Sequence, residues 1–91
     1  MRLILYSKPG CHLCEGLQEK LEQIKNLSFD LEVRDITTCE DWLQTYQYEV
    51  PVLHLSNRLS AEDLTETPLP RPSPRASVQQ LEQMLGKYLS N

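Results

Sequence analysis

Lys8-Pro9-Gly10-Cys11-His12-Leu13-Cys14 decides the fold, because it separates a short apolar run from an amphipathic segment. The run before it, Leu3-Ile4-Leu5-Tyr6, is continuous and stops at the Pro-Gly pair, which is typical of a strand buried in a parallel sheet. The segment after it places large apolar residues three or four positions apart, at Leu13, Leu17, Leu21 and Ile24. This spacing predicts an amphipathic helix over residues 12–25, so the two cysteines stand where a strand ends and a helix begins.

The spacing and the place of the two cysteines indicate thiol–disulfide chemistry. Cys11 is expected at the helix N-terminus, where free backbone N–H groups and the positive end of the helix dipole favour a thiolate. Cys14 follows one turn later and is expected to be less exposed. We therefore predict that Cys11 is the nucleophile that attacks a disulfide and that Cys14 resolves the mixed disulfide. Two inert thiols are the alternative interpretation.

Two neighbours of the pair, Lys8 and His12, are candidates for electrostatic tuning of the thiols, since a positive charge favours a nearby thiolate. For each, a solvated side chain without such a role is the alternative. Zinc sites usually need four ligands, and besides the pair only Cys39, His12 and His54 are available, without paired spacing. We therefore expect no metal site within one chain and no bound cofactor, although a cluster shared between two chains stays an alternative.

The middle of the chain predicts two more strands and a short helix. Alternating apolar residues over 29–33 predict a second strand with one buried face. Thr37 followed by Glu40 resembles a capping box, which predicts a helix that carries Trp42, Leu43 and Tyr46. A third strand is expected over residues 51–55.

The last part of the chain predicts a hairpin, a stiff loop and a closing helix. Ser56-Asn57 is expected to form a tight turn into a fourth strand over residues 58–60. Proline at alternate positions, from Pro68 to Pro74, predicts an extended, proline-rich loop over residues 65–75. Ser77 with Gln80 forms a second capping box, after which one helix face carries Val78, Leu81, Leu85 and Tyr88.

Length and composition indicate one small domain over residues 1–91. Its formal net charge of −4 argues against a general nucleic-acid binder, and no apolar run approaches the ~18 residues of a membrane span. The first apolar run is shorter than the ~7–15 residues of a signal-peptide core, so we expect a cytoplasmic protein. In a reducing compartment, a close pair among three cysteines is more often catalytic or metal-binding than structural.

The order of these elements, β-α-β-α-β-β-α, predicts an α/β fold of the thioredoxin-like sandwich type, with a four-stranded mixed sheet flanked by helices. The chain resembles the glutaredoxin-like domain family, in which a Cys-His-Leu-Cys motif occurs. Lys8-Pro9-x-Cys11 is similar to the active-site entry of glutaredoxins, and Val50-Pro51 opens a later strand as it does in that family. The resemblance implies that Pro51 is cis and faces the cysteines, and that the Val50 backbone pairs with the thiol substrate. A trans proline that only begins a strand is the alternative.

The resemblance implies a thiol–disulfide oxidoreductase that acts on a disulfide-containing protein or a small thiol substrate, with an electron donor that the sequence does not identify. Glutathione is the candidate co-substrate. Glutaredoxins usually carry Gly-Gly and then Asp after the fourth strand, whereas this chain has Ser60-Ala61-Glu62-Asp63, of which Asp63 is the candidate to receive an amino group. A redox-sensing or metal- or cluster-binding module without catalysis, on the same fold, is the alternative.

The remaining candidates are interpreted mainly as structural. Cys39 is expected in the first turn of the second helix, as an inert, small apolar residue. The aromatic side chains near it are expected either to pack or to contact a ligand; they are Trp42, Tyr46 and Tyr48.

Overall fold

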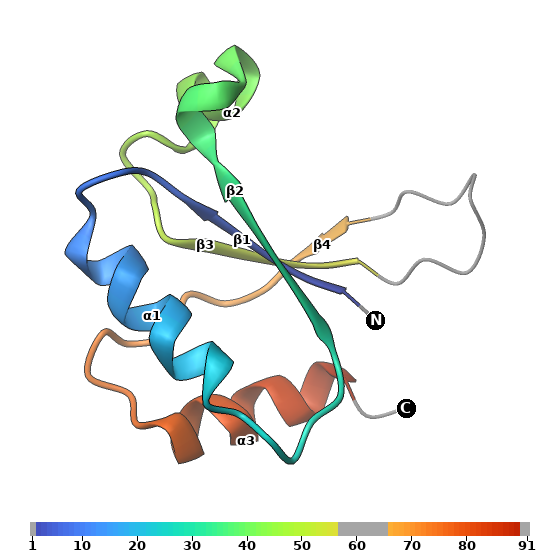
Figure 1. The fold of residues 1–91 in the computed structure, drawn as a ribbon. Helices are drawn as coiled ribbons and strands as arrows, with labels where there is room; N and C mark the ends of the chain where they lie inside the picture. The colour runs from blue at the N-terminus through green and yellow to red at the C-terminus, as the bar shows by residue number, and fades with distance from the viewer. Residues whose placement is uncertain (1, 57–65, 90–91) are drawn as a thin grey trace.

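The structure is a computed structural model that describes residues 2–56 and 66–89. The described residues form four strands and three α-helices in the predicted order (Figure 1). The elements are β1 (Arg2–Ser7), α1 (His12–Glu22), β2 (Asp30–Asp35), α2 (Glu40–Tyr46), β3 (Val52–Ser56), β4 (Glu66–Pro68) and α3 (Val78–Leu89). The strands lie in the order β2-β1-β3-β4, with β1 parallel to β2 and antiparallel to β3. The predicted thioredoxin-like fold with a mixed sheet is therefore confirmed.

One face of the sheet is covered by α1 and α3, which lie side by side below it in Figure 1. The aliphatic core fills this layer and includes Leu3 and Leu5 of β1, together with Leu17, Leu21, Leu53, Leu55, Leu81 and Leu85. Strand β1 is central, and its residues Leu3–Tyr6 are all buried. The apolar run of β1 is continuous because side chains pack against both faces of this strand.

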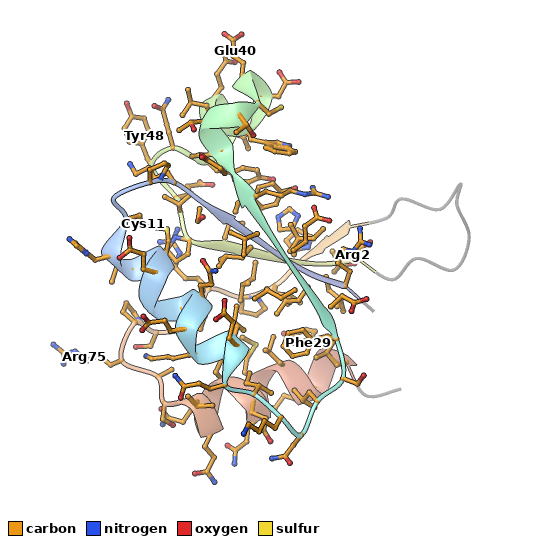
Figure 2. All side chains as sticks on the ribbon, in the orientation of Figure 1. Arg2, Cys11, Phe29, Glu40, Tyr48 and Arg75 are labelled. Atoms are coloured by element: carbon orange, nitrogen blue, oxygen red, sulfur yellow. A yellow bond between two sulfur atoms is a disulfide. The ribbon has the colours of Figure 1, made fainter. Side chains whose placement is uncertain are left out.

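The opposite face of the sheet carries an aromatic cluster beneath α2. Tyr6 lies at its centre, with its ring centroid 4.5 Å from that of Tyr46 and 5.7 Å from that of Trp42. Trp42 and Tyr46 therefore pack against Tyr6, which agrees with the interpretation of these side chains as packing residues. Tyr48 does not, because it is 91% exposed and points away from the body of the protein (Figure 2).

Helix α1 is shorter than predicted and presents a different face to the core. It ends at Glu22, and its buried residues are Cys14, Leu17 and Leu21. Leu13, which the spacing assigned to the core, is 55% exposed. The assignment was wrong because Cys14 is itself apolar and three residues before Leu17, so it takes the buried position in the first turn.

The fourth strand lies in the segment that was expected to be a loop. Glu66–Pro68 pairs with β3, whereas the strand predicted over residues 58–60 falls outside the described residues. The Leu69 N–H donates to the Leu53 carbonyl (3.0 Å), and since strand residues alternate, the nitrogen of Pro68 faces away from β3. A proline is tolerated there because β4 is an edge strand and loses no ladder hydrogen bond.

The second strand is also less buried than its alternation predicts. Val33 is exposed, while Phe29 and Leu31 pack against the aliphatic core. Strand β2 is at the other edge of the sheet, so the helical layer covers only part of its inner face.

The two predicted capping boxes have different outcomes. The one before α3 is confirmed, because the Gln80 N–H donates to Ser77 Oγ (3.1 Å) and the Ser77 N–H donates to Gln80 Oε1 (2.9 Å). The one at Thr37 is wrong. Residues Ile36–Thr38 instead form a short 3₁₀ turn that Asp35 caps, and α2 begins after Cys39.

Candidate functional site

The cysteine pair lies at the start of α1, where a tight turn connects it to β1. The Cys11 N–H donates to the Lys8 carbonyl (3.3 Å), and Gly10 between them has φ +78°. Such a turn favours proline at its second position and requires a positive φ at its third, which Pro9 and Gly10 supply. The local sequence thus fixes Cys11 as the residue that caps the helix.

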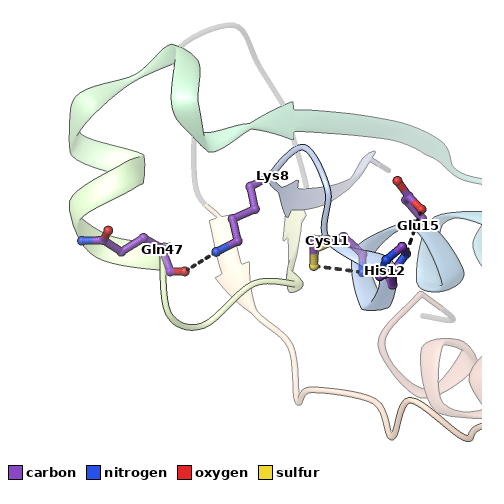
Figure 3. Close-up of a disulfide and its surroundings, with 6 residues drawn as sticks. Lys8, Cys11, His12, Glu15 and Gln47 are labelled. Carbon is purple, nitrogen blue, oxygen red and sulfur yellow. Dashed lines mark hydrogen bonds and ion pairs between the residues drawn. A yellow bond between two sulfur atoms is a disulfide. The ribbon is translucent and has the colours of Figure 1, made fainter.

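Cys11 and Cys14 are joined by a disulfide, with their Cα atoms 5.3 Å apart. Cys11 has extended backbone angles and precedes the first helical residue, so its sulfur is near the free N–H groups of the first turn. The Cys14 N–H points at this sulfur, with 3.3 Å between nitrogen and Sγ (Figure 3). The helix start therefore presents a hydrogen-bond donor to the sulfur of Cys11.

The two sulfurs differ in their access to solvent. Cys11 is partly exposed, whereas Cys14 is only 2% exposed and belongs to the buried face of α1. A substrate in solution therefore has access to Cys11 and not to Cys14. This asymmetry supports the predicted order of attack, in which Cys11 reacts first.

A cis peptide bond connects Val50 to Pro51 at the start of β3, as the family resemblance implies. Pro51 is buried and lines the same groove as His12 and Leu13 of α1. The Val50 N–H already donates to the Tyr46 carbonyl (3.1 Å). The N–H of Val50 is thus engaged within the fold, and the pairing of the Val50 backbone with a thiol substrate stays a prediction.

The two candidate tuning residues make contacts that lead away from the sulfurs. Lys8 Nζ donates to the Gln47 carbonyl (3.3 Å), which ties the active-site turn to the end of α2 (Figure 3). His12 is almost fully exposed, with Nδ1 3.7 Å from a Glu15 carboxylate oxygen. The effect of these two side chains on the thiols stays a prediction.

A groove of about 320 Å³ extends from this site along α1. Leu13, Gly16 and Leu17 form one wall, and Arg71–Pro74 with Ala76 form the other. Sequence reasoning missed both walls as functional surface. The spacing assigns Leu13 to the core, and the alternating prolines predict only a stiff loop over residues 65–75.

Comparison with known proteins agrees with this geometry. Residues 2–86 match the signature of the glutaredoxin-like domain. The chain belongs to the glutaredoxin-like domain family. It is also similar to the X-ray structure of Northeast Structural Genomics target protein XcR50 from X. campestris, with 25% identity and a TM-score of 0.58. That similarity covers 93% of this chain and 96% of the other. No curated protein matches the chain.

The position of β4 changes which residues of this glutaredoxin-like domain follow the fourth strand. The sequence comparison had placed Ser60-Ala61-Glu62-Asp63 there, but β4 ends at Pro68. Asp63 lies outside the described residues, so its predicted role stays untested. The residues that follow β4 are Leu69, Pro70 and Arg71. Arg71 and Pro51 both line the groove described above, and both also line a second groove, which contains Tyr48 and Glu49.

The remaining candidates have no ligand-binding geometry in the described part of the chain. Within residues 2–56 and 66–89, no three His, Cys, Asp or Glu side chains are grouped as a metal site requires. Cys39 is half-buried and precedes α2 without a capping bond from its side chain. Among the same residues, no helix combines the length and the apolar character needed to cross a membrane.

Proposed function

We propose that this glutaredoxin-like domain is a thiol–disulfide oxidoreductase. The observation that carries the proposal is the Cys11–Cys14 disulfide at the start of α1, where the next residue, His12, lines a groove together with the cis Pro51. A partly exposed sulfur at a helix N-terminus, with a buried second sulfur one turn later, has the arrangement that dithiol exchange requires.

The reductive half of the cycle proceeds in two displacements. The Cys11 thiolate attacks one sulfur of the substrate disulfide, forming a mixed disulfide and releasing the other substrate sulfur as a thiolate. The Cys14 thiolate then attacks Cys11 Sγ, which forms the Cys11–Cys14 disulfide and releases the second substrate thiolate. Two electrons pass from the protein to the substrate, and each released thiolate takes up a proton from water.

The residues around the pair assist these steps by position. The Cys14 N–H faces the Cys11 sulfur and stabilises negative charge on it. The carbonyl of Val50 accepts a backbone N–H of the substrate and so orients its disulfide toward Cys11. A thiol donor then restores the dithiol by the same two displacements in reverse; we propose either glutathione, two molecules per cycle, or a protein dithiol.

Reduction assays on two substrates test the proposal. One substrate is a protein disulfide and the other is a mixed disulfide between glutathione and a cysteine-containing peptide. We expect the wild-type protein to reduce both and Cys11→Ser to reduce neither. Cys14→Ser retains exchange with the glutathione mixed disulfide when glutathione is present. With the protein substrate and no free thiol, it accumulates a covalent adduct, because the resolving cysteine is missing.

The outcome that contradicts the proposal is equally specific. If the wild-type protein is inactive on both substrates and its cysteines stay reduced across a series of glutathione redox buffers, the domain is not an oxidoreductase. Mass spectrometry after alkylation measures the redox state directly. Dependence on glutathione is decided separately, by comparing glutathione with dithiothreitol as the reductant.

A further inference from the structure

The groove beside the disulfide has a composition that indicates a particular class of substrate. It begins at His12 and Pro51, next to the active-site turn, and continues along α1 as far as Lys20. The rise from His12 to Lys20 is about 12 Å at ~1.5 Å per helical residue. An extended peptide rises ~3.3 Å per residue, so the groove has room for about three to four substrate residues.

The second wall of the groove is held in place by Lys20. Its Nζ donates to the carbonyls of Pro74 (3.0 Å) and Ala76 (2.6 Å), which fastens the segment after β4 to the middle of α1. Lys20, Pro74 and Ala76 are all part of the groove lining. The wall is therefore a fixed part of the fold, and the stiff conformation that its prolines favour maintains its shape.

The chemistry of this wall favours contacts with side chains over strand pairing. Pro72 and Pro74 have no backbone N–H, so they cannot donate to an added strand. What they present, together with Leu13 and Gly16 on the opposite wall, is apolar surface. Leu13 is an exposed leucine, and a substrate side chain that covers it removes apolar area from water.

The charges of the groove have one sign. Its lining contains Lys20 and Arg71 and no aspartate or glutamate, although the whole chain has a net charge of −4. Lys20 is engaged with the two carbonyls, whereas Arg71 is exposed and, like Pro51, also lines a second groove. Within the described part of the chain, Arg71 forms no ion pair.

We infer that the groove binds an extended segment of a substrate protein that carries a carboxylate close to the target cysteine and apolar residues beyond it. Arg71 receives the carboxylate, and the surface of Leu13, Gly16 and Pro74 receives the apolar side chains. This inference rests on the proposed function, because it assigns the substrate of the same site. Arg71 acts as a specificity-determining residue that binds substrate without taking part in sulfur chemistry.

Binding is tested without any sulfur chemistry, on the Cys11→Ser/Cys14→Ser protein. Two synthetic peptides carry serine in place of the target cysteine and apolar residues after it; they differ only in an aspartate or a lysine beside that serine. We expect the aspartate peptide to bind about fivefold more tightly, as for an exposed ion pair, with the preference reduced by added salt. NMR titration should locate the shifts at α1 and residues 71–76.

The chain offers a matched control for Arg71. Arg75 is also an exposed arginine, but it is not part of the groove lining and points into solvent in Figure 2. Arg71→Ala should abolish the preference for the aspartate peptide, and Arg71→Glu should reverse it. Arg75→Ala should retain it. Equal affinity of the two peptides, or a preference that survives Arg71→Ala, would overturn the inference.

A rate measurement separates this inference from the proposed function. The small neutral disulfide of 2-mercaptoethanol has no carboxylate and is too short to occupy the groove. If the wild-type protein reduces it while the two peptides bind equally, the inference is wrong and the proposed function stands. If the protein reduces neither this compound nor a protein disulfide, the proposed function fails whatever the peptides show.

Discussion

Two helices of this domain begin after a cysteine, and their surroundings differ. Cys11 precedes α1 and Cys39 precedes α2, each with extended backbone angles and partial burial. The Cys11 sulfur accepts the Cys14 N–H, whereas the Cys39 side chain makes no capping bond. Helix α1 has eleven residues and a buried face, while α2 has seven residues and none that is buried.

The comparison teaches that a helix start alone does not make a redox site. Cys11 also has a second thiol one turn later, and the residue after it, His12, lines a groove together with the cis Pro51. Cys39 has none of these among the described residues, and the chain before it is occupied by the 3₁₀ turn that Asp35 caps. On the proposed function, reactivity requires the combination of these elements, and each element can be removed separately.

The largest expected effect distinguishes the two cysteines by activity. Cys11→Ser should reduce disulfide exchange to the level of the buffer, because serine cannot form the mixed disulfide. Cys39→Ser should leave the rate unchanged. The measurement is the initial rate of protein-disulfide reduction under identical thiol concentrations.

Alkylation of the reduced protein provides an independent check. Iodoacetamide should modify Cys11 before Cys39 at neutral pH, as peptide mapping by mass spectrometry would show. If Cys39→Ser lowers the rate as far as Cys11→Ser does, the contrast between the two helix starts is wrong.

The next effect concerns how firmly each helix is attached to the sheet. Leu21→Ala in α1 should lower the free energy of unfolding by about 2–5 kcal/mol, because Leu21 is fully buried in the aliphatic core. Leu43→Ala in α2 should cost less, about 1–2 kcal/mol, since Leu43 is only partly buried. Urea denaturation followed by circular dichroism measures both; a larger loss in Leu43→Ala would contradict the comparison.

Much of the fold was predictable from local patterns that agree with one another. The apolar run of β1, the turn at Pro9-Gly10 and the capping box of α3 each have one favourable conformation, and the structure adopts it. The cysteine pair was predictable for the same reason, since a strand, a turn and a helix frame it. The cis bond before Pro51 came from the family resemblance and not from the residues alone.

What was not predictable depends on contacts between distant segments. The spacing of the leucines assigns Leu13 to the core. This assignment is wrong because Cys14 fills the first buried position of α1. The alternating prolines predict a loop in place of β4. A proline fits an edge strand only when its nitrogen faces away from the neighbouring strand, and the sequence does not show which side of the strand is paired. The groove could not be predicted without both of these facts, because one wall belongs to α1 and the other to the segment that follows β4.

A smaller effect sharpens the comparison at the start of α2. Cys39 precedes α2 with backbone angles suited to a cap but without a capping bond. Cys39→Ser places a hydroxyl oxygen where it can accept a free N–H of the first turn, so the free energy of unfolding should rise by about 0.5–1 kcal/mol. Thermal and urea unfolding would both show the gain. A loss of stability would indicate that packing of the half-buried sulfur outweighs the cap.

The smallest effect is a pH dependence next to the same helix. The Thr37 side chain and then its backbone N–H donate to Asp35 Oδ1, and these bonds lower the pKa of the Asp35 carboxyl below its ordinary value. The unfolded chain therefore binds this proton more readily than the folded chain does. The contribution of Asp35 to stability should be complete above about pH 4 and should decline as the pH falls through the folded pKa. Asp35→Asn removes the titration, so its stability should approach that of the wild type in acid; a difference that stays constant between pH 7 and pH 3 would show that the carboxylate charge does not hold the turn.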